Sequence, residues 1–220
     1  MAVMGRAGTG KPGTGRPGTS RLCLTQDPEA DQLLEDDPFA LLIGMLLDQQ
    51  IPMETAFAGP RKLADRLGGL EPAEIAGYDP AKFAEICAKS PAVHRFPGSM
   101  AKRLQKLART VVDDYGGDAA AIWTMGEPDG TEVLRRLTSL PGFGLQKARI
   151  FLALLGKQYG ANPEGWREAA GDYGDPDARM SIADVVDKGT LEQVRAYKKK
   201  MKTAARSAGK SAAKSAKEST

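Results

Sequence analysis

Apolar residues recur at spacings of three and four along the middle of the chain, and this pattern predicts helices. The first clear helix follows Asp37-Pro38, which supply a cap and a first-turn proline, and it is expected to end near Gln50. Further helices are expected from Pro52 to Gly68 with a bend at Gly59-Pro60, after Pro72, after Pro80, from Pro97 to Gly116, and over 131–137 and 145–159. No segment alternates apolar and polar residues as a half-buried strand does, so the sequence predicts an all-α fold.

The two ends of the chain differ from this middle part. Residues 1–22 repeat a five-residue pattern of basic residue, Pro or Ala, Gly and Thr, in which glycine entropy and the missing proline donor oppose packed structure. Residues 203–220 repeat Lys, Ala and Ser with almost no large apolar residue, although the alanines permit transient helix. We therefore expect disordered basic tails at 1–22 and 203–220 around a helical domain at 23–202.

Charge is distributed unevenly along the chain. The net charge is +3, yet residues 1–22 carry four basic and no acidic side chains, and residues 195–220 carry nine basic side chains against Glu218 alone. The middle of the chain is therefore acidic, at −9. The tails suggest a polyanionic partner through neutralisation of phosphates, and any nucleic-acid site in the middle must be local.

Composition narrows the class of protein further. The longest strongly apolar stretch, Phe39 to Leu47, falls short of the roughly 20 residues that a bilayer span needs, and no pattern of a secretion signal precedes it. We expect a cytoplasmic protein, associated with the nucleoid if it is bacterial, with no membrane partner. Cys23 and Cys87 are the only cysteines, too few for a disulfide framework or a four-thiolate metal site.

One short motif carries chemical information. Leu140-Pro141-Gly142-Phe143-Gly144 separates the last two predicted helices, which together form a hairpin at about 131–159. Two glycines one residue apart allow a tight turn and leave amide groups at a helix start without intrahelical partners. Such a turn can bind a phosphate, and it can equally be a simple helix connection.

Leu140 to Ala148 resembles the Leu-Pro-Gly-x-Gly loop of the helix-hairpin-helix (HhH-GPD) superfamily of DNA glycosylases. Upstream, Leu46-Leu47-Asp48-Gln49-Gln50 is similar to the Leu-Leu-x-x-Gln segment of the same family. The resemblance runs from about residue 36 to 160. It implies a two-lobed helical body with a cleft, a hairpin loop that grips a backbone phosphate, and a glutamine, Gln50, that fills the gap left by a flipped base.

This resemblance implies a set of DNA-binding residues, which includes Gln49 and Gln50. The alternative for these two glutamines is a polar helix end exposed to solvent. Family members that also cleave the strand carry a lysine two residues after the second glycine, where this chain has Gln146. Lys147 is adjacent, but one residue turns a helical side chain by about 100°, so the sequence favours an enzyme that does not cleave the strand. The expected DNA-binding residues are Gln49, Gln50, Leu140, Gly142, Phe143, Gly144, Gln146 and Lys147.

The family's essential aspartate lies eighteen to twenty residues after that lysine position, which here falls on Glu164, Gly165 and Trp166. We expect Glu168 or Asp184 to substitute for it, with surface or capping roles as the alternative for both. Asp172, Asp175 and Asp177 are further candidates if the loop is longer than in relatives.

We expect no cofactor and no iron–sulfur cluster, and a cation shared between the hairpin and a phosphate stays open. His94 is a weak candidate because a lone histidine is more often a surface residue, and Trp166 is expected to pack beneath the cleft.

The sequence favours a DNA-binding base-excision repair protein, a monofunctional glycosylase that hydrolyses the N-glycosidic bond of a damaged or mispaired base. A catalytically inactive lesion sensor or architectural protein of the same fold is the first alternative, and a helical protein-interaction domain is the second. The expected partner is double-stranded DNA, bound by a monomer.

Overall fold

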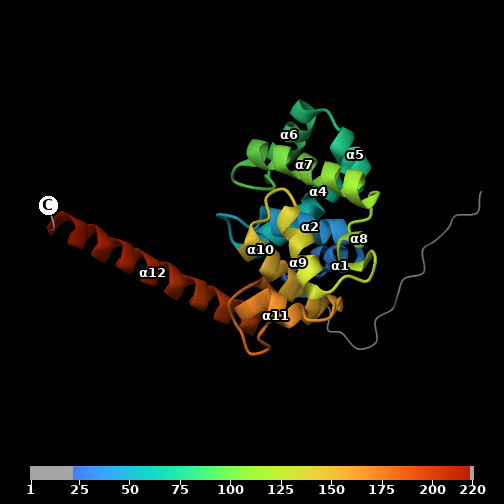
Figure 1. Ribbon diagram of the computed structural model, residues 1–220. Helices are drawn as coiled ribbons and strands as arrows, with labels where there is room; N and C mark the ends of the chain where they lie inside the picture. The colour runs from blue at the N-terminus through green and yellow to red at the C-terminus, as the bar shows by residue number, and fades with distance from the viewer. Residues whose placement is uncertain (1–21, 219–220) are drawn as a thin grey trace, which may run out of the picture.

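The computed structural model describes residues 22–218, with side chains up to residue 204. Within that range the chain forms helices and turns and no strands (Figure 1), which confirms the predicted all-α class. The helices are α1 (Pro28–Asp36), α2 (Pro38–Leu47), α3 (Met53–Phe57), α4 (Gly59–Leu67), α5 (Pro72–Gly77), α6 (Pro80–Ala88), α7 (Pro97–Tyr115), α8 (Ala121–Thr124), α9 (Gly130–Ser139), α10 (Leu145–Leu154), α11 (Trp166–Ala170) and α12 (Lys188–Glu218). Short turns of other helix types lie at Leu155–Tyr159, Gly171–Gly174 and Ile182–Asp184.

The helices begin and end where the sequence places capping residues. The Asp37 carboxylate accepts hydrogen bonds from the amides of Phe39 and Ala40, at 2.8 and 3.2 Å, and so satisfies two amides at the start of α2. Gly68 and Gly116 end α4 and α7 with φ of 80° and 62°, a conformation that glycine adopts without steric cost.

The helix α2 forms the centre of the molecule. Every residue from Phe39 to Leu47 is buried, and α1, α3, α4 and α7 pack against it. The helices α5 and α6 pack on α7 to form one lobe, and α9, α10 and α11 pack together to form the other (Figure 1). Each large side chain buried in this way contributes about 1.5–3 kcal/mol, and the side chains of α2 belong to the same hydrophobic core as those of both lobes.

Some predicted helix boundaries were wrong. The helix expected to end near Gln50 ends at Leu47. The side chains of Lys147 and Gln49, and not the amides of a further helical turn, donate to its last carbonyls. The predicted helix at 145–159 changes to a wider π turn at Leu155–Tyr159 and ends at Gly160, whose φ is 72°. The bend expected at Gly59-Pro60 is confirmed as the boundary between α3 and α4.

The two predicted disordered tails differ in how far the structure reaches them. Residues 1–21, 219 and 220 lie outside the described part of the chain. The backbone of residues 203–218 continues α12, which projects from the body (Figure 1). Disorder of the tails therefore stays a prediction. The alanines of residues 203–220 also predict transient helix, and the backbone there is helical as far as Glu218. Among the described residues, no helix has both the length and the apolar character needed to cross a membrane.

Candidate nucleic-acid interface

The turn between α9 and α10 exposes the start of a helix. Gly142, Gly144, Leu145 and Gln146 are all exposed, and no side chain caps the amides at the start of α10. Leu145 is an apolar side chain with half of its surface in contact with solvent. Uncapped amides at a helix start attract anions, because the helix dipole adds to their hydrogen-bonding capacity.

Two other residues of the turn have a supporting position. The side chains of Leu140 and Phe143 are buried, and the Phe143 ring packs edge-on against Phe151 with centroids 5.9 Å apart. Their buried side chains support the turn from beneath, and contact of these two residues with DNA stays a prediction. Gly142 has φ of 83°, and a Cβ there would lie 2.5 Å from Leu46 Cδ1. Both the backbone conformation and the close approach to α2 therefore require glycine.

Lys147 joins the hairpin to the end of α2. Its Nζ donates to the carbonyl oxygens of Met45 and Leu46, at 2.6 and 3.1 Å, across 102 and 101 positions of sequence. These carbonyls belong to the last turn of α2, where no intrahelical donor remains for them. Burial lowers the pKa of Lys147 to about 8, and the charge of Asp48 opposes this effect. The prediction that Lys147 faces away from Gln146 is consistent with these contacts, because Gln146 Nε2 instead donates to the Tyr173 hydroxyl at 2.9 Å.

Gln49 lies in a turn that neighbouring side chains hold from three directions. Its Nε2 donates to the Leu46 carbonyl at 2.7 Å, and its Oε1 accepts from Arg103 at 2.9 Å. His94 Nδ1 accepts from the Phe96 amide at 3.0 Å, so the ring proton lies on Nε2, which donates to the Gln49 carbonyl at 2.8 Å. His94 is 4% exposed, which corrects the expectation of a surface histidine.

Gln50 is the exposed tip of the same turn. Its φ is 58°, a left-handed conformation that residues other than glycine adopt rarely. Its side chain extends into solvent while its neighbour Gln49 is fixed on both sides. A strained backbone held by its surroundings is typical of functional turns, and here it presents one amide side chain next to the hairpin.

Sequence reasoning missed a second exposed residue near this turn. Phe96 is 45% exposed at the start of α7, with the Arg95 guanidinium 4.7 Å from its ring centre. The bond from its amide to His94 places Phe96 next to the Gln49 turn. The signal in the sequence was an aromatic residue between a basic residue and a proline, in Arg95-Phe96-Pro97.

Asp184, one of the two predicted catalytic carboxylates, lies away from the hairpin turn. Asp184 Oδ1 accepts from Lys157 at 2.6 Å, and its Oδ2 accepts from the amides of Met180 and Ser181. Lys157 follows Gln146 by eleven positions on α10 and the turn after it, so it lies about 16 Å away at 1.5 Å per residue. Asp184 also forms a capping box with Ser181, the alternative role that the sequence left open.

Glu168 lies on α11, between Trp166, which packs on the end of α10, and the segment that returns to the start of α10 at Tyr173. It is exposed on α11, and its carboxylate has no hydrogen bond or ion pair within the described part of the chain. The indole of Trp166, two residues earlier, packs so tightly on Gly156 that a Cβ there would lie 2.4 Å from the ring, which confirms the packing role expected for this tryptophan. The chain returns to the start of α10 at Tyr173 instead, where Asp172 is an exposed neighbour.

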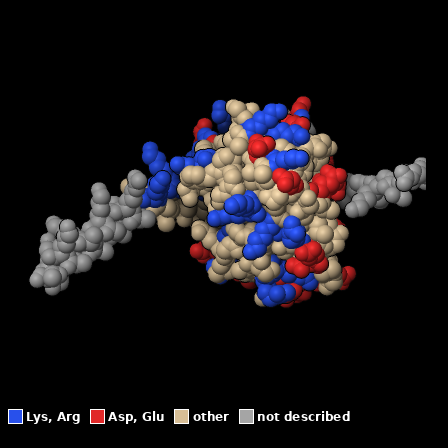
Figure 2. Space-filling model, turned by 90° about the horizontal axis from the view of Figure 1, so that it is seen from above, with Lys and Arg blue, Asp and Glu red and all other residues tan. Residues whose placement is uncertain are grey.

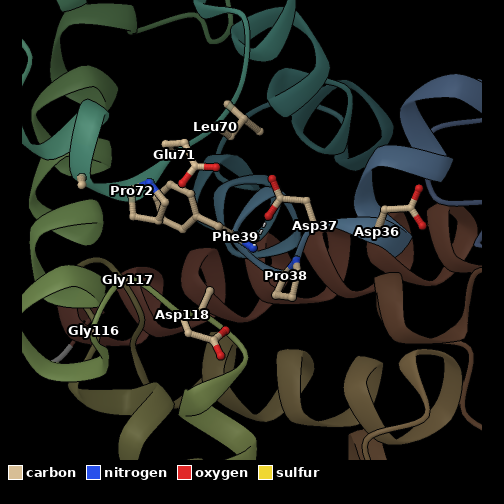
Figure 3. Close-up of a pocket in the computed structure, with 12 residues that line it drawn as sticks. Asp36, Asp37, Pro38, Phe39, Leu70, Glu71, Pro72, Gly116, Gly117 and Asp118 are labelled. Atoms are coloured by element: carbon tan, nitrogen blue, oxygen red, sulfur yellow. Dashed lines mark hydrogen bonds between the residues drawn. The ribbon is translucent and has the colours of Figure 1, made fainter. Parts of the chain in front are cut away.

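Charged side chains are unevenly spread over the face seen in Figure 2. Lys and Arg lie where α12 leaves the body and also across the middle of this face, and Asp and Glu are more frequent on the side away from α12. A cavity of about 440 Å³ lies at the start of α2, where the segments that follow α4 and α7 also line it. Figure 3 shows the carboxylates of Asp37, Glu71 and Asp118 around it. Burial raises the pKa of Asp37, and the charge of Glu71 adds to this effect. An acidic lining repels phosphate, so this cavity is unsuited to nucleic acid.

The described residues contain no group of three or more His, Cys, Asp or Glu side chains placed to hold a metal ion. Cys87 is fully buried, as its apolar neighbours predict, and burial raises the pKa of its thiol to about 11.

Comparison with protein families gives one match. A family model described as HhH-GPD superfamily base excision DNA repair protein matches residues 43–214. No curated protein and no solved structure gives a significant match. The matched range includes both the Gln49–Gln50 turn and the hairpin, and it covers most of the chain. The chain therefore belongs to the HhH-GPD superfamily of base-excision DNA repair proteins, which bind DNA.

Proposed function

We propose that this protein binds duplex DNA through the hairpin and the Gln49–Gln50 turn, extrudes a damaged or mispaired base, and hydrolyses its N-glycosidic bond without cleaving the strand. The observation that carries this proposal is the bond from Lys147 to the end of α2, because it joins two motifs about 100 residues apart into one exposed surface. Extruding a base costs a few kcal/mol, and a turn that is already formed in the free protein reduces the further cost of ordering it.

Each part of this surface has a separate role in the proposal. The amides at Gly144 and the first turn of α10 bind one backbone phosphate. Gln50 enters the base stack in place of the extruded base, and the exposed ring of Phe96 contacts the neighbouring bases. Gln49 stays with the protein, since Arg103 and the Leu46 carbonyl occupy both ends of its amide.

Hydrolysis without strand cleavage requires water as the nucleophile. The position of the family's Schiff-base lysine holds Gln146, and the Lys147 ammonium is bound to two carbonyls of α2. Neither side chain offers an amine to the sugar in this arrangement. Water then needs a carboxylate to orient it and to stabilise the sugar cation that develops.

The candidate for this carboxylate that lies beside the hairpin is Asp172. It is exposed, and its neighbour Tyr173 accepts a hydrogen bond from Gln146 in the first turn of α10. Glu168 and Asp184 remain predictions, and the position of Asp184 at the other end of α10 favours Asp172 over Asp184. In addition, Asp184 already accepts hydrogen bonds from one lysine and two backbone amides.

The lack of an aspartate at the family's spacing after Gln146, together with the distance of Asp184 from the hairpin, favours a second candidate function. A protein that keeps the phosphate-binding turn and the glutamine, but has no carboxylate positioned for hydrolysis, would bind lesions without excising them. Such a lesion sensor has the same DNA-binding surface, so only a measurement of product separates the two functions.

The test is a panel of duplexes that contain uracil, alkylated, oxidised or mispaired bases, assayed for alkali-labile sites with the full chain. A glycosylase produces such sites on at least one duplex, and Asp172→Asn lowers the rate at least a hundredfold while Glu168→Gln leaves it unchanged. Borohydride traps no covalent adduct with abasic DNA, because no Schiff base forms. Tight binding to a lesion without product would support the sensor and contradict hydrolysis.

A further inference from the structure

The helix α12 is anchored to the body beside the Gln49–Gln50 turn. Leu191 and Val194 are buried in the core, and Arg195 forms an ion pair with Glu54, three residues after Ile51. One turn further on, Lys198 Nζ lies 3.7 Å from Met53 Sδ. These contacts fix both the position and the rotation of α12 about its own axis.

Beyond this anchor, α12 leaves the body. All residues from Lys198 to Ala204 are exposed, and the helical backbone continues to Glu218. In Figure 1 the helix projects far beyond the lobes. At 1.5 Å per residue, the part from Lys199 to Glu218 is about 30 Å long, which equals the rise of about nine base pairs at 3.4 Å each.

The basic residues of this projecting part follow the period of the helix. Successive positions are about 100° apart around an α-helix, so spacings of three and four residues return to the same side. The spacings along the stripe are 3, 4, 4, 4 and 3, which place all six positions within about 120° of the helix circumference. These basic stripe positions are Lys199, Lys202, Arg206, Lys210, Lys214 and Lys217.

Between 203 and 216, the charged residues are Arg206, Lys210 and Lys214. Every other position in this range is Ala, Ser, Gly or Thr. The backbone of this segment, which composition alone marks as a low-complexity tail, is helical, and on such a backbone its basic positions fall on one side. Like charges at spacings of three and four repel each other, so the stripe weakens the isolated helix. A row of phosphates along the stripe removes that repulsion, which favours a polyanion as its partner.

We propose that α12 is an arm that lies along the DNA backbone on one side of the lesion, with its basic stripe facing the phosphates. This inference rests on the proposed function for the identity of the partner. It adds that binding depends on the rotational phase of the stripe relative to the anchored body, and not only on the number of positive charges. A flexible polycationic tail has no such dependence.

The test compares binding to a 12-bp and a 24-bp duplex with the same central mispair, over a series of salt concentrations. One variant ends at residue 202. A second variant moves three basic residues by two positions, about 200° around the helix, and keeps length, composition and net charge. Its exchanges are Arg206→Ala with Ala208→Arg, Lys210→Ala with Ala212→Lys, and Lys214→Ala with Ala216→Lys.

We expect the full chain to bind the 24-bp duplex at least tenfold more tightly than the 12-bp duplex at low salt. Both variants lose most of this gain, and truncation lowers the slope of log affinity against log salt by about 3, since it removes four basic residues. Protection from cleavage by hydroxyl radicals extends about nine base pairs further on one side of the mispair only with the full chain.

Two outcomes overturn the proposal. If the exchanged variant binds like the full chain, the tail acts as an unordered polycation, and if truncation changes nothing, α12 does not contact DNA. Binding to the 12-bp duplex depends on the hairpin surface alone, so a failure of the proposed DNA-binding surface is detected there. A failure of the arm is detected only in the difference between the two lengths.

Discussion

The backbone groups that lack an intrahelical partner at the two ends of α2 are bonded by side chains of opposite charge. At its first turn, the carboxylate of Asp37 accepts hydrogen bonds from two amides that have no intrahelical partner. At its last turn, the ammonium of Lys147 and the amide of Gln49 donate to the carbonyls that have none. Both arrangements follow from the geometry of a helix end. The first end of α2 lies beside an acidic cavity. The last end lies beside the exposed amides of the hairpin turn at Gly142–Gln146, and we call it the donor-rich end.

This difference separates the proposed DNA-binding surface from the cavity at the other end of α2. The cavity at the start of α2 has about 440 Å³ and is lined by Asp36, Asp37, Glu71 and Asp118, which exclude phosphate. The surface at the other end has exposed glycines, an uncapped helix start and a strained glutamine turn. The sign of the charge and the exposure of the backbone, and not the volume of the cavity, therefore support the proposed site.

The largest expected effect comes from Gly142→Ala at the donor-rich end. The new methyl group combines a left-handed φ with a contact of 2.5 Å to Leu46, so we expect a loss of about 2–3 kcal/mol of unfolding free energy. We also expect at least a tenfold loss of duplex affinity, because the turn has to move away from α2. Denaturant titration and fluorescence anisotropy measure the two effects.

A matched control for this variant is Gly68→Ala at the end of α4. Gly68 has nearly the same φ, 80°, but a Cβ there meets nothing within 4 Å. The control should lose about 1 kcal/mol from backbone strain and no DNA affinity. Equal DNA affinities for the two variants would show that the hairpin turn does not contact DNA.

The next effect is a pH dependence that arises from Lys147. Its pKa is lowered to about 8 in the folded protein by burial, against 10.5 for an ordinary lysine. Between these two pH values the unfolded chain binds more protons than the folded chain, so this group makes the folded state more stable as pH rises. We expect the unfolding free energy of the natural chain to rise relative to Lys147→Met by up to about 1 kcal/mol per pH unit from pH 8 to 10.

Denaturant titrations at pH 7.5, 9 and 10 test this dependence. Lys106→Met, on the exposed face of α7, serves as the control because removal of an exposed charge should give a difference that stays constant with pH. A constant difference for Lys147→Met as well would mean that its ammonium is not buried against α2.

The smallest effect is expected at the acidic end of α2. Asp37→Ala removes the cap of the helix and should lower the unfolding free energy by about 1 kcal/mol, whereas Asp37→Asn keeps an oxygen acceptor and should lose less. Neither variant should weaken duplex binding, since this end carries no phosphate contact. A severalfold loss of affinity in either variant would contradict the assignment of the two ends.

The sequence predicted those features that depend on local signals. Asp-Pro pairs marked the starts of α2 and α6, Gly68 and Gly116 marked two ends, and the apolar period identified α2 as a buried helix. The hairpin and the glutamine segment were found because each is a short contiguous motif. Their proximity could only be inferred through the family resemblance.

The parts that sequence reasoning missed depend on contacts between distant residues. The bond from Lys147 to Met45 spans 102 positions, and the burial of His94 depends on the carbonyl of Gln49, 45 positions away. Asp184 was predicted as a substitute for the family's aspartate, which is missing at the expected distance from Gln146, and its place at a helix start with Ser181 is explained by a capping box. Spacing in sequence could not show that α10 carries Lys157 and Asp184 away from the hairpin.

The most direct test of this account is the fluorescence of 2-aminopurine placed next to a mispair in a 24-bp duplex, recorded on addition of the full chain. Unstacking of the probe raises its fluorescence, so we predict a clear rise with the natural chain and the loss of most of that rise with Gln50→Ala at saturating protein. The same rise with Gln50→Ala, or none with the natural chain on any lesion, would contradict the claim that this end of α2 opens the base stack.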